Sequence, residues 1–196
     1  EHTPLTFDDY SATTPYGKSK VFLEKYIRDN CHNSYYDWII FRPTSIWGPW
    51  FDEPYRDFFN AVLNGSYFHP YNKKIYKSFG YVGNSVFLLE KMLASEKKLD
   101  KETIYLSDYE NLDILEWANA IRSKNKLSNI RQIPLFFLRI VAFFGTFLEK
   151  VGLKRVPLTQ FRLNNLITST DYNVELLKEF SKDLPYTMHQ GVEKTL

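Results

Sequence analysis

The stretch TTPYGKSK, residues 13–20, places a tyrosine and a lysine four residues apart. Pro15 suits the first position of a helix and Thr14 suits the N-cap, so the sequence predicts a helix that begins at Pro15. Tyr16 and Lys20 would then lie one above the other on the same face. A phenol ordinarily titrates near pH 10, but a lysine ammonium one turn away stabilises the phenolate, and the helix dipole adds a smaller contribution. Tyr16 is therefore a candidate general acid/base.

The same spacing also has a purely structural interpretation. Tyr16 could pack against a neighbouring element while Lys20 is a solvated charge on the helix surface. Spacing alone favours this structural interpretation, so the rest of the sequence has to decide between the two.

The elements that follow alternate between helix and strand. Apolar residues at helical spacing continue the first helix to the polar segment 29–34, and a short apolar run at 38–41 then indicates a buried strand that opens into a loop at Gly48-Pro49. Helices are predicted over Pro54 to Leu63 with Gly65 as the cap, from about Asn84 with Val86, Leu89 and Leu93 inward, and from Asn111 or Asp113, with a strand over 102–107. This alternation predicts an α/β fold with parallel strands.

Composition excludes several classes of protein. The chain has 196 residues, a net charge of +2 and no long basic run, which gives no support for a nucleic-acid partner. Cys31 is the only cysteine, so an internal disulfide is excluded, and the four scattered histidines form no metal-ligand cluster. We expect a reducing, cytoplasmic setting. The N-terminal ten residues lack the basic and apolar regions of a signal peptide.

The longest apolar run is IPLFFLRIVAFFGTFL, residues 133–148, with Arg139 near its centre. It is shorter than the about 20 residues that span a bilayer, so no transmembrane segment is predicted. We expect a buried helix of the core or of a subunit interface. A membrane-surface role is the alternative, because the run is rich in aromatic residues.

Three separated stretches carry a resemblance to a known family. They are TPLTFDDYSATTPYGKSKVFLEKY, FRPTSIWGPW and KSFGYVGNSVFLLEKML, in this order. Together they resemble the C-terminal two-thirds of extended short-chain dehydrogenase/reductases, most closely the NAD(P)-dependent epimerase/dehydratases that act on nucleotide sugars. The resemblance implies the back half of a Rossmann-like, doubly wound parallel sheet with a small C-terminal substrate-binding lobe. We expect residues 1–196 to form one continuous unit.

The resemblance implies roles for several residues. Tyr16 and Lys20 match the family's catalytic pair, and Lys20 would also bind the nicotinamide ribose. The motif that begins at Phe41 matches the wall of the cofactor and sugar pocket. It assigns cofactor contacts to Phe41, Arg42, Pro43 and Thr44, and substrate contacts to Arg42 and Ser45.

Two further positions are expected to contact the substrate. Lys77 replaces the family's usual arginine at the diphosphate, and it supplies a point charge without the bidentate fork. Asn84 replaces the usual aspartate and could serve equally well as a helix N-cap. Arg162 matches an arginine that reaches the nucleotide diphosphate, although a surface or salt-bridged arginine is an equal alternative.

One family feature is missing from these residues. No G-x-G-x-x-G or G-x-x-G-x-x-G occurs among the eight glycines, so the Gly-rich loop that holds the dinucleotide is absent, and the family's catalytic Ser or Thr is expected upstream of Glu1. Thr13 and Thr14 suit helix capping better than that role. We therefore expect part of a nucleotide-sugar epimerase or related sugar oxidoreductase that uses NAD, which is favoured, or NADP, and that is inactive as this segment alone.

Two statements about partners complete the expectations. The family often dimerises through the Tyr-Lys helix, so exposed apolar residues around Phe22 and Tyr26 would support a homodimer. The alternative to an enzyme is a non-catalytic remnant that survives as a binding or interaction module.

Overall fold

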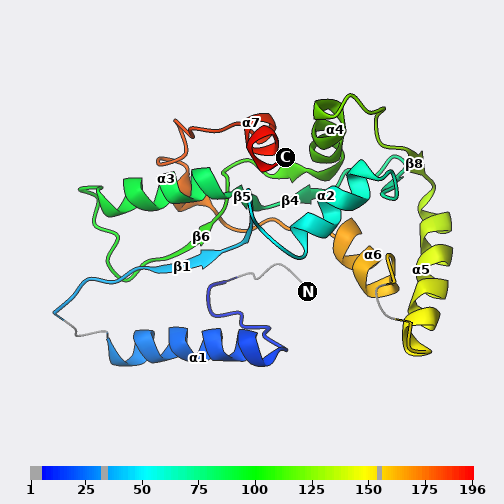
Figure 1. Cartoon of the computed structure of the whole chain (residues 1–196). Coiled ribbons are helices and arrows are strands. Elements are labelled where there is room, and N and C mark those ends of the chain that lie inside the picture. The colour runs from blue at the N-terminus through cyan, green and yellow to red at the C-terminus, as the bar shows by residue number, and fades with distance from the viewer. Residues whose placement is uncertain (1–5, 32–34, 154–155) are drawn as a thin grey trace. The chain divides into compact units, whose positions relative to one another are not determined.

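The computed structural model describes residues 6–31, 35–153 and 156–196, and its contacts divide the chain into two compact units (Figure 1). The first unit comprises Glu1–Ile46, Ser78–Glu110 and Tyr172–Pro185, and the second comprises Trp47–Lys77, Asn111–Asp171 and Tyr186–Leu196. The chain passes between the units several times, so no single position in the sequence separates them. The prediction that residues 1–196 form one continuous unit stays a prediction.

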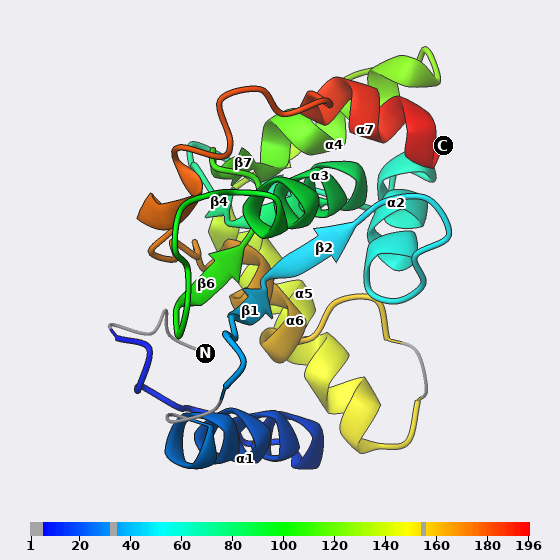
Figure 2. The same cartoon turned by 90° about the vertical axis from the view of Figure 1, so that its left-hand side faces the viewer.

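The first unit is built in layers around two parallel strands. β1 (Ile40–Pro43) pairs with β6 (Thr103–Leu106), with Ile40 opposite Thr103 and Pro43 opposite Leu106. Figures 1 and 2 both show α3 (Val82–Leu93) on one side of this pair and α1 (Pro15–Asn30) on the other. Helices on both sides of parallel strands define the doubly wound class. The predicted α/β fold is confirmed.

The core of the first unit lies between α3, β6 and the C-terminal stretch. All four residues of β6 are buried, as expected for a parallel strand that is covered on both faces. The last members of the core along the chain are Leu177, at the end of the short 3₁₀ helix η1 (Glu175–Leu177), and Phe180, just after it. The buried apolar residues are Leu88, Met92, Leu99, Ile104, Leu106, Leu177 and Phe180.

The first helix follows its sequence prediction. α1 begins at Pro15, and the Thr14 hydroxyl accepts a hydrogen bond from the Gly17 backbone N–H at 3.1 Å. The helix ends at Asn30; the polar segment predicted after it includes residues 32–34, which lie outside the described residues.

The sequence prediction for α3 is wrong in two respects. The helix begins at Val82, so Asn84 lies within its first turn, where it is buried, and does not cap it. Ser85, Leu88 and Met92 are buried and Leu89 packs against the core as predicted, whereas Val86 and Leu93 are exposed. Two polar residues of α3 can be buried because their side chains form hydrogen bonds. The Ser85 hydroxyl donates to the Tyr81 carbonyl at 3.2 Å, and Asn84 hydrogen-bonds Asp108. The inward face therefore includes two polar residues that a purely apolar pattern does not find.

The second unit contains the remaining α-helices and two short strand pairings. Its helices include α2 (Tyr55–Leu63), α4 (Ile114–Lys124), α5 (Leu135–Lys150), α6 (Gln160–Ile167) and α7 (Met188–Thr195). The strands β3 (His69–Pro70) and β8 (Gln132–Ile133) are parallel, and β4 (Tyr76–Lys77) and β7 (Leu112–Asp113) are antiparallel. In the first unit, β2 (Ser45–Trp47), whose last residue belongs to the second unit, pairs with β5 (Phe79–Tyr81).

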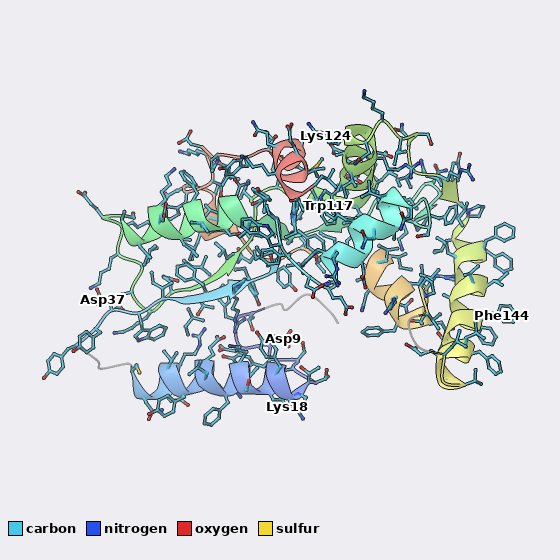
Figure 3. The ribbon with its side chains drawn as sticks, viewed as in Figure 1. Asp9, Lys18, Asp37, Trp117, Lys124 and Phe144 are labelled. Carbon is cyan, nitrogen blue, oxygen red and sulfur yellow. The ribbon has the colours of Figure 1, made fainter. Side chains whose placement is uncertain are left out.

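Aromatic side chains hold α2 against α4. The Trp117 ring stacks on Phe58 with centroids 4.8 Å apart and meets Trp47 at 5.1 Å (Figure 3). Two predicted signals at the ends of these helices are confirmed. Asp113 caps α4 by accepting from the Leu115 backbone N–H at 2.8 Å, and Gly65 after α2 has a φ of 73°, in the left-handed region that favours glycine.

The apolar run at 133–148 forms α5, and the expectation of a core helix is wrong, whereas a place in a subunit interface stays a prediction. Only Leu138, Ala142 and Gly145 are buried, and α5 packs on α6. The approach is close at Gly145, where a Cβ would lie 1.9 Å from the Leu158 carbonyl oxygen. Apolar residues occur on every side of α5, whereas α6 covers only one side of it. Among the described residues, no helix combines the length and apolar character needed to cross a membrane.

Candidate functional site

Tyr16 and Lys20 lie in the first two turns of α1, as predicted. Tyr16 is 73% exposed, and the Lys20 Nζ lies 5.3 Å from the centroid of the Tyr16 ring. In Figure 1, α1 runs opposite to β1, so its first turn lies toward the carboxyl end of that strand. Ligands of doubly wound sheets bind beyond the carboxyl ends of the strands. The pair is therefore accessible on the side of the first unit where such a fold places its ligands.

A buried carboxylate follows the pair on the same helix. Glu24, one turn beyond Lys20, is 9% exposed and accepts hydrogen bonds from the guanidinium groups of Arg42 and Arg28. Burial alone would raise the pKa of Glu24, but the hydrogen bonds from these two arginines outweigh it, and the pKa is lowered. Glu24 is thus held as a carboxylate one turn beyond the exposed pair.

The Arg42 guanidinium group has hydrogen-bond partners around its edge and aromatic rings close to it. Besides its two hydrogen bonds to Glu24, it donates from Nη1 to the Tyr105 hydroxyl at 2.8 Å and from Nη2 to the Phe7 carbonyl at 2.5 Å. The rings of Phe7, Tyr10 and Tyr105 lie between 5.3 and 5.5 Å from its guanidinium carbon, within the range of cation–π attraction. Burial lowers the pKa of Arg42, but the hydrogen bonds that Arg42 donates to Glu24 and Tyr105 raise it above its ordinary value.

These contacts bear on the role expected of Arg42. The sequence predicts contacts with cofactor and substrate, whereas the structure engages the guanidinium within the protein and joins β1 to α1 and β6. Its geometry is that of a positioning residue. Direct ligand contact by Arg42 stays a prediction.

The other predicted pocket residues surround the end of β1. Phe41 packs against the core, and Pro43 is exposed. The Thr44 backbone N–H and hydroxyl both donate to the Leu106 carbonyl, at 3.0 and 3.1 Å, and Ser45 is half-buried at the start of β2. The structure therefore brings Phe41 to Ser45 to the carboxyl end of the parallel pair, and their contacts with ligands stay predictions.

The two remaining predicted substrate residues belong to the second unit. Lys77 is buried, and its Nζ donates to the carbonyls of Asn165, at 2.7 Å, and Thr168, at the C-terminal end of α6. A lysine there complements the carbonyls and the negative end of the helix dipole. Arg162 is exposed, and its Nη1 donates to the carbonyls of Val156, at 3.0 Å, and Pro157. Their diphosphate contacts stay predictions.

Asp108 is a residue that the sequence reasoning missed. It lies two residues after the end of β6, and its Oδ2 accepts from the Tyr81 backbone N–H at 3.2 Å. Its buried Oδ1 has no hydrogen-bond partner among the described residues. Burial raises the pKa of Asp108 to about 7, although the hydrogen bonds from Tyr81 and Asn84 oppose this effect. A carboxyl group shortly after a buried strand is the signal that could have found it.

Two other kinds of site were sought in the part of the chain that the structure describes. No group of His, Cys, Asp or Glu side chains there could hold a metal ion. A shallow hollow of about 370 Å³ lies along α4, and its lining includes Asp113, Asn119 and His189. None of the predicted site residues lines it, so the hollow has no part in the chemistry considered below.

The chain has the fold of the nucleotide-sugar epimerases whose structures are known. UDP-glucuronic acid 4-epimerase from Bacillus cereus, in complex with NAD, matches all of this chain and 56% of its own, with a TM-score of 0.62 and 14% identity. UDP-glucose 4-epimerase from Thermotoga maritima, with UDP-glucose, matches 94% of this chain and 53% of its own, with a TM-score of 0.58 and 15% identity. An epimerase from Methanothermobacter thermautotrophicus matches 98% and 53%, with a TM-score of 0.57 and 14% identity.

The comparisons limit what this likeness shows. No family model and no curated protein matches the sequence. This chain spans a little over half the length of the solved chains that it resembles. At 13 to 15% identity the likeness shows the fold alone, and the predicted Rossmann-like α/β fold is confirmed.

Proposed function

We propose that this chain carries the Tyr-Lys acid/base pair of an NAD(P)-dependent nucleotide-sugar epimerase or a related sugar oxidoreductase. The observation that supports the proposal most directly is the exposed Tyr16, with Lys20 one turn away, on the helix whose first turn lies at the carboxyl end of β1. Two solved proteins with this fold are epimerases, one in complex with NAD and one with UDP-glucose.

In the proposed reaction, Tyr16 moves a proton at its phenolic oxygen. As the phenolate it accepts the proton of a sugar hydroxyl while hydride leaves the carbon that bears this hydroxyl, so a keto-sugar forms. The Lys20 Nζ lies 5.3 Å from the centroid of the Tyr16 ring, so its positive charge is close to the reacting group. Return of the hydride to the opposite face, with return of the proton from Tyr16, inverts the carbon. A bound nicotinamide cofactor supplies the hydride acceptor and donor.

The residues present fit part of the site for such a cofactor. Lys20 is exposed, so its ammonium is accessible to the hydroxyls of a ribose. The sequence contains no Gly-rich loop for a pyrophosphate, so that part of the site does not come from these residues. We favour NAD over NADP.

The proposal is tested by substitution of Tyr16 in the full-length protein. Tyr16→Phe removes the proton-transferring hydroxyl and keeps the ring, and we expect conversion of UDP-glucose or UDP-glucuronic acid to fall by about a hundredfold to ten-thousandfold. Tyr26→Phe is the matched control, because Tyr26 is also an exposed tyrosine of α1. Product is measured by chromatography of the sugar nucleotides. Equal rates for the Tyr16 variant and the native protein would remove Tyr16 from the chemistry.

A second candidate function rests on one observation. The absence of a Gly-rich dinucleotide loop among these residues favours a non-catalytic module that binds a ligand or another protein. The two candidates differ in cofactor binding. The epimerase binds NAD or NADP in equilibrium dialysis of the full-length protein, and the binding module binds neither.

The homodimer and the cellular location remain part of this proposal. Phe22 is 72% exposed and Tyr26 is 53% exposed on α1, and such apolar side chains would be covered by a second copy of the helix. We keep the cytoplasm as the expected location.

A further inference from the structure

We propose that α5 and the turn after it form a membrane-surface face that docks onto an anionic lipid bilayer. The feature that carries the proposal is the side of α5 opposite α6, which presents large apolar side chains to solvent. Figure 3 shows Phe144 pointing outward from this side, and its side chain is 59% exposed. The outward residues are Phe136, Phe137, Ile140, Val141, Phe143, Phe144, Phe147 and Leu148.

The pattern along α5 is that of a helix with two different apolar sides. At the 3.6-residue repeat, the outward residues occupy a continuous arc of about 160° that contains no charged side chain. The buried side, Leu138, Ala142 and Gly145, lies opposite this arc and packs on α6. Arg139 and Lys150 lie along one edge of the arc. An apolar arc with basic residues at its edge is typical of helices that lie in the membrane interface.

The apolar face continues beyond α5 itself. Val151 and Leu153, in the turn after the helix, are 61% and 56% exposed, and Phe161 on the adjoining α6 is 73% exposed. Exposed single apolar residues are ordinary, but a contiguous set of this size marks a surface that another phase or molecule covers.

Charge identifies which occupant this surface fits. The described residues of α5, of the turn after it and of α6 as far as Arg162 include three basic residues, Arg139, Lys150 and Arg162, and one acidic residue, Glu149. These residues carry a net charge of +2, which equals the net charge of the whole chain. A bilayer with anionic headgroups is attracted by this charge, at about a factor of five for each basic residue near the surface. A second copy docked symmetrically would instead place like charges together.

The length of α5 determines how the face meets the lipid. Its 16 residues rise by about 24 Å, less than the roughly 30 Å of the hydrocarbon core. One side is already covered by α6. The helix therefore lies in the plane of the interface, with its phenylalanines among the acyl chains and its basic edge at the headgroups.

The test is sedimentation of the full chain with lipid vesicles. We expect binding to vesicles of phosphatidylglycerol and phosphatidylcholine in equal amounts, weaker binding to phosphatidylcholine alone, and loss of the difference at high salt. The double variant Phe143→Ser, Phe144→Ser should bind about a hundredfold more weakly, because two phenylalanine side chains no longer enter the lipid. Leu93→Ser is the control, because Leu93 is an apolar residue of another helix, α3, that is 71% exposed and belongs to neither proposed surface.

A second variant keeps the proposal falsifiable if the first affects folding. Lys150→Glu reverses one charge at the edge of the face and should weaken binding to the anionic vesicles by about tenfold or more. Failure of the native chain to sediment with anionic vesicles overturns the proposal. So does a double variant that binds them as well as the native chain, or one that only changes a dimer into a monomer in sedimentation velocity.

Discussion

The Glu24 carboxylate and the Arg42 guanidinium form a bidentate ion pair, with Nη2 2.6 Å from Oε1 and Nε 3.0 Å from Oε2. Glu24 belongs to α1 and Arg42 to β1, so the pair fixes the helix against the strand. Because Tyr16 and Lys20 lie on the same helix, the position of the proposed catalytic pair relative to the end of β1 depends on this contact. The buried ion pair between Glu24 and Arg42 therefore holds the α1 layer of the first unit against its β1 layer.

Removing the charge of Glu24 should destabilise the protein strongly. Glu24→Gln leaves Arg42 and Arg28 without their carboxylate, and breaking a buried ion pair in this way typically costs about 3–5 kcal/mol. The free energy of unfolding is measured by urea titration. Glu179→Gln is the control, because it removes an exposed partner of Lys97 and should change stability by no measurable amount. Equal effects of the two substitutions would contradict the structural importance of the Glu24 contact.

Stability should fall as pH rises through the range in which Asp108 titrates. The folded-state pKa is about 7, above the ordinary value of 3.8, so between these values the folded protein retains a proton that the unfolded chain has lost. The contribution to the free energy of unfolding therefore decreases by roughly 1.4 kcal/mol for each pH unit in this window and levels off above it.

Asp108→Asn supplies the comparison for this pH dependence. The amide stays neutral at every pH, so the decrease between about pH 4 and pH 7 should be smaller in the variant than in the native protein. Denaturant titrations at several pH values measure it. A variant with the same pH dependence as the native protein would exclude Asp108 as its source.

The contact between α5 and α6 should not tolerate a methyl group at Gly145. A Cβ there would lie 1.9 Å from the Leu158 carbonyl oxygen, so the backbone has to move. We expect Gly145→Ala to lower the free energy of unfolding by about 1–3 kcal/mol, as overpacking does elsewhere. Val141→Ala, on the exposed side of the same helix, should change it by less than about 0.5 kcal/mol in the same thermal unfolding assay. A neutral Gly145 variant would show that the two helices do not approach this closely.

The proposed homodimer depends on the exposed face of α1. The double variant Phe22→Ser, Tyr26→Ser removes the largest apolar side chains of that face, and we expect the full-length dimer to dissociate in sedimentation velocity. Phe144→Ser should leave the dimer intact, because it lies on the face proposed to bind lipid. Dissociation by the Phe144 substitution, with no effect from the α1 variant, would transfer the interface to α5.

The sequence predicts α1 well because its signals are local. Thr14, Pro15 and the apolar spacing act within one or two turns, and the structure begins and ends the helix where they indicate. The cap of α4 at Asp113 has the same origin. The fold class could also be predicted, because the alternation of helices and strands is visible in a single sequence.

Contacts between distant residues are what the sequence could not supply. No residue near Glu24 in the sequence indicates that Arg42 forms an ion pair with it. The inward position of Asn84 likewise depends on a hydrogen bond with Asp108, which lies outside α3. The exposed side of α5 was missed for a related reason: an apolar pattern shows which residues can be buried, whereas the neighbours determine which of them are.

The core of the first unit is built from segments that are far apart in the sequence. The order in which the ribosome makes these segments therefore affects how the unit folds during synthesis. Leu88 and Ile104 are made before Leu177 and Phe180, which complete the same core. On the ribosome the partly made core would expose apolar surface until these last residues emerge. A nascent chain that stalls before Tyr172 is therefore expected to require a chaperone, even though both strands of the parallel pair have already been made.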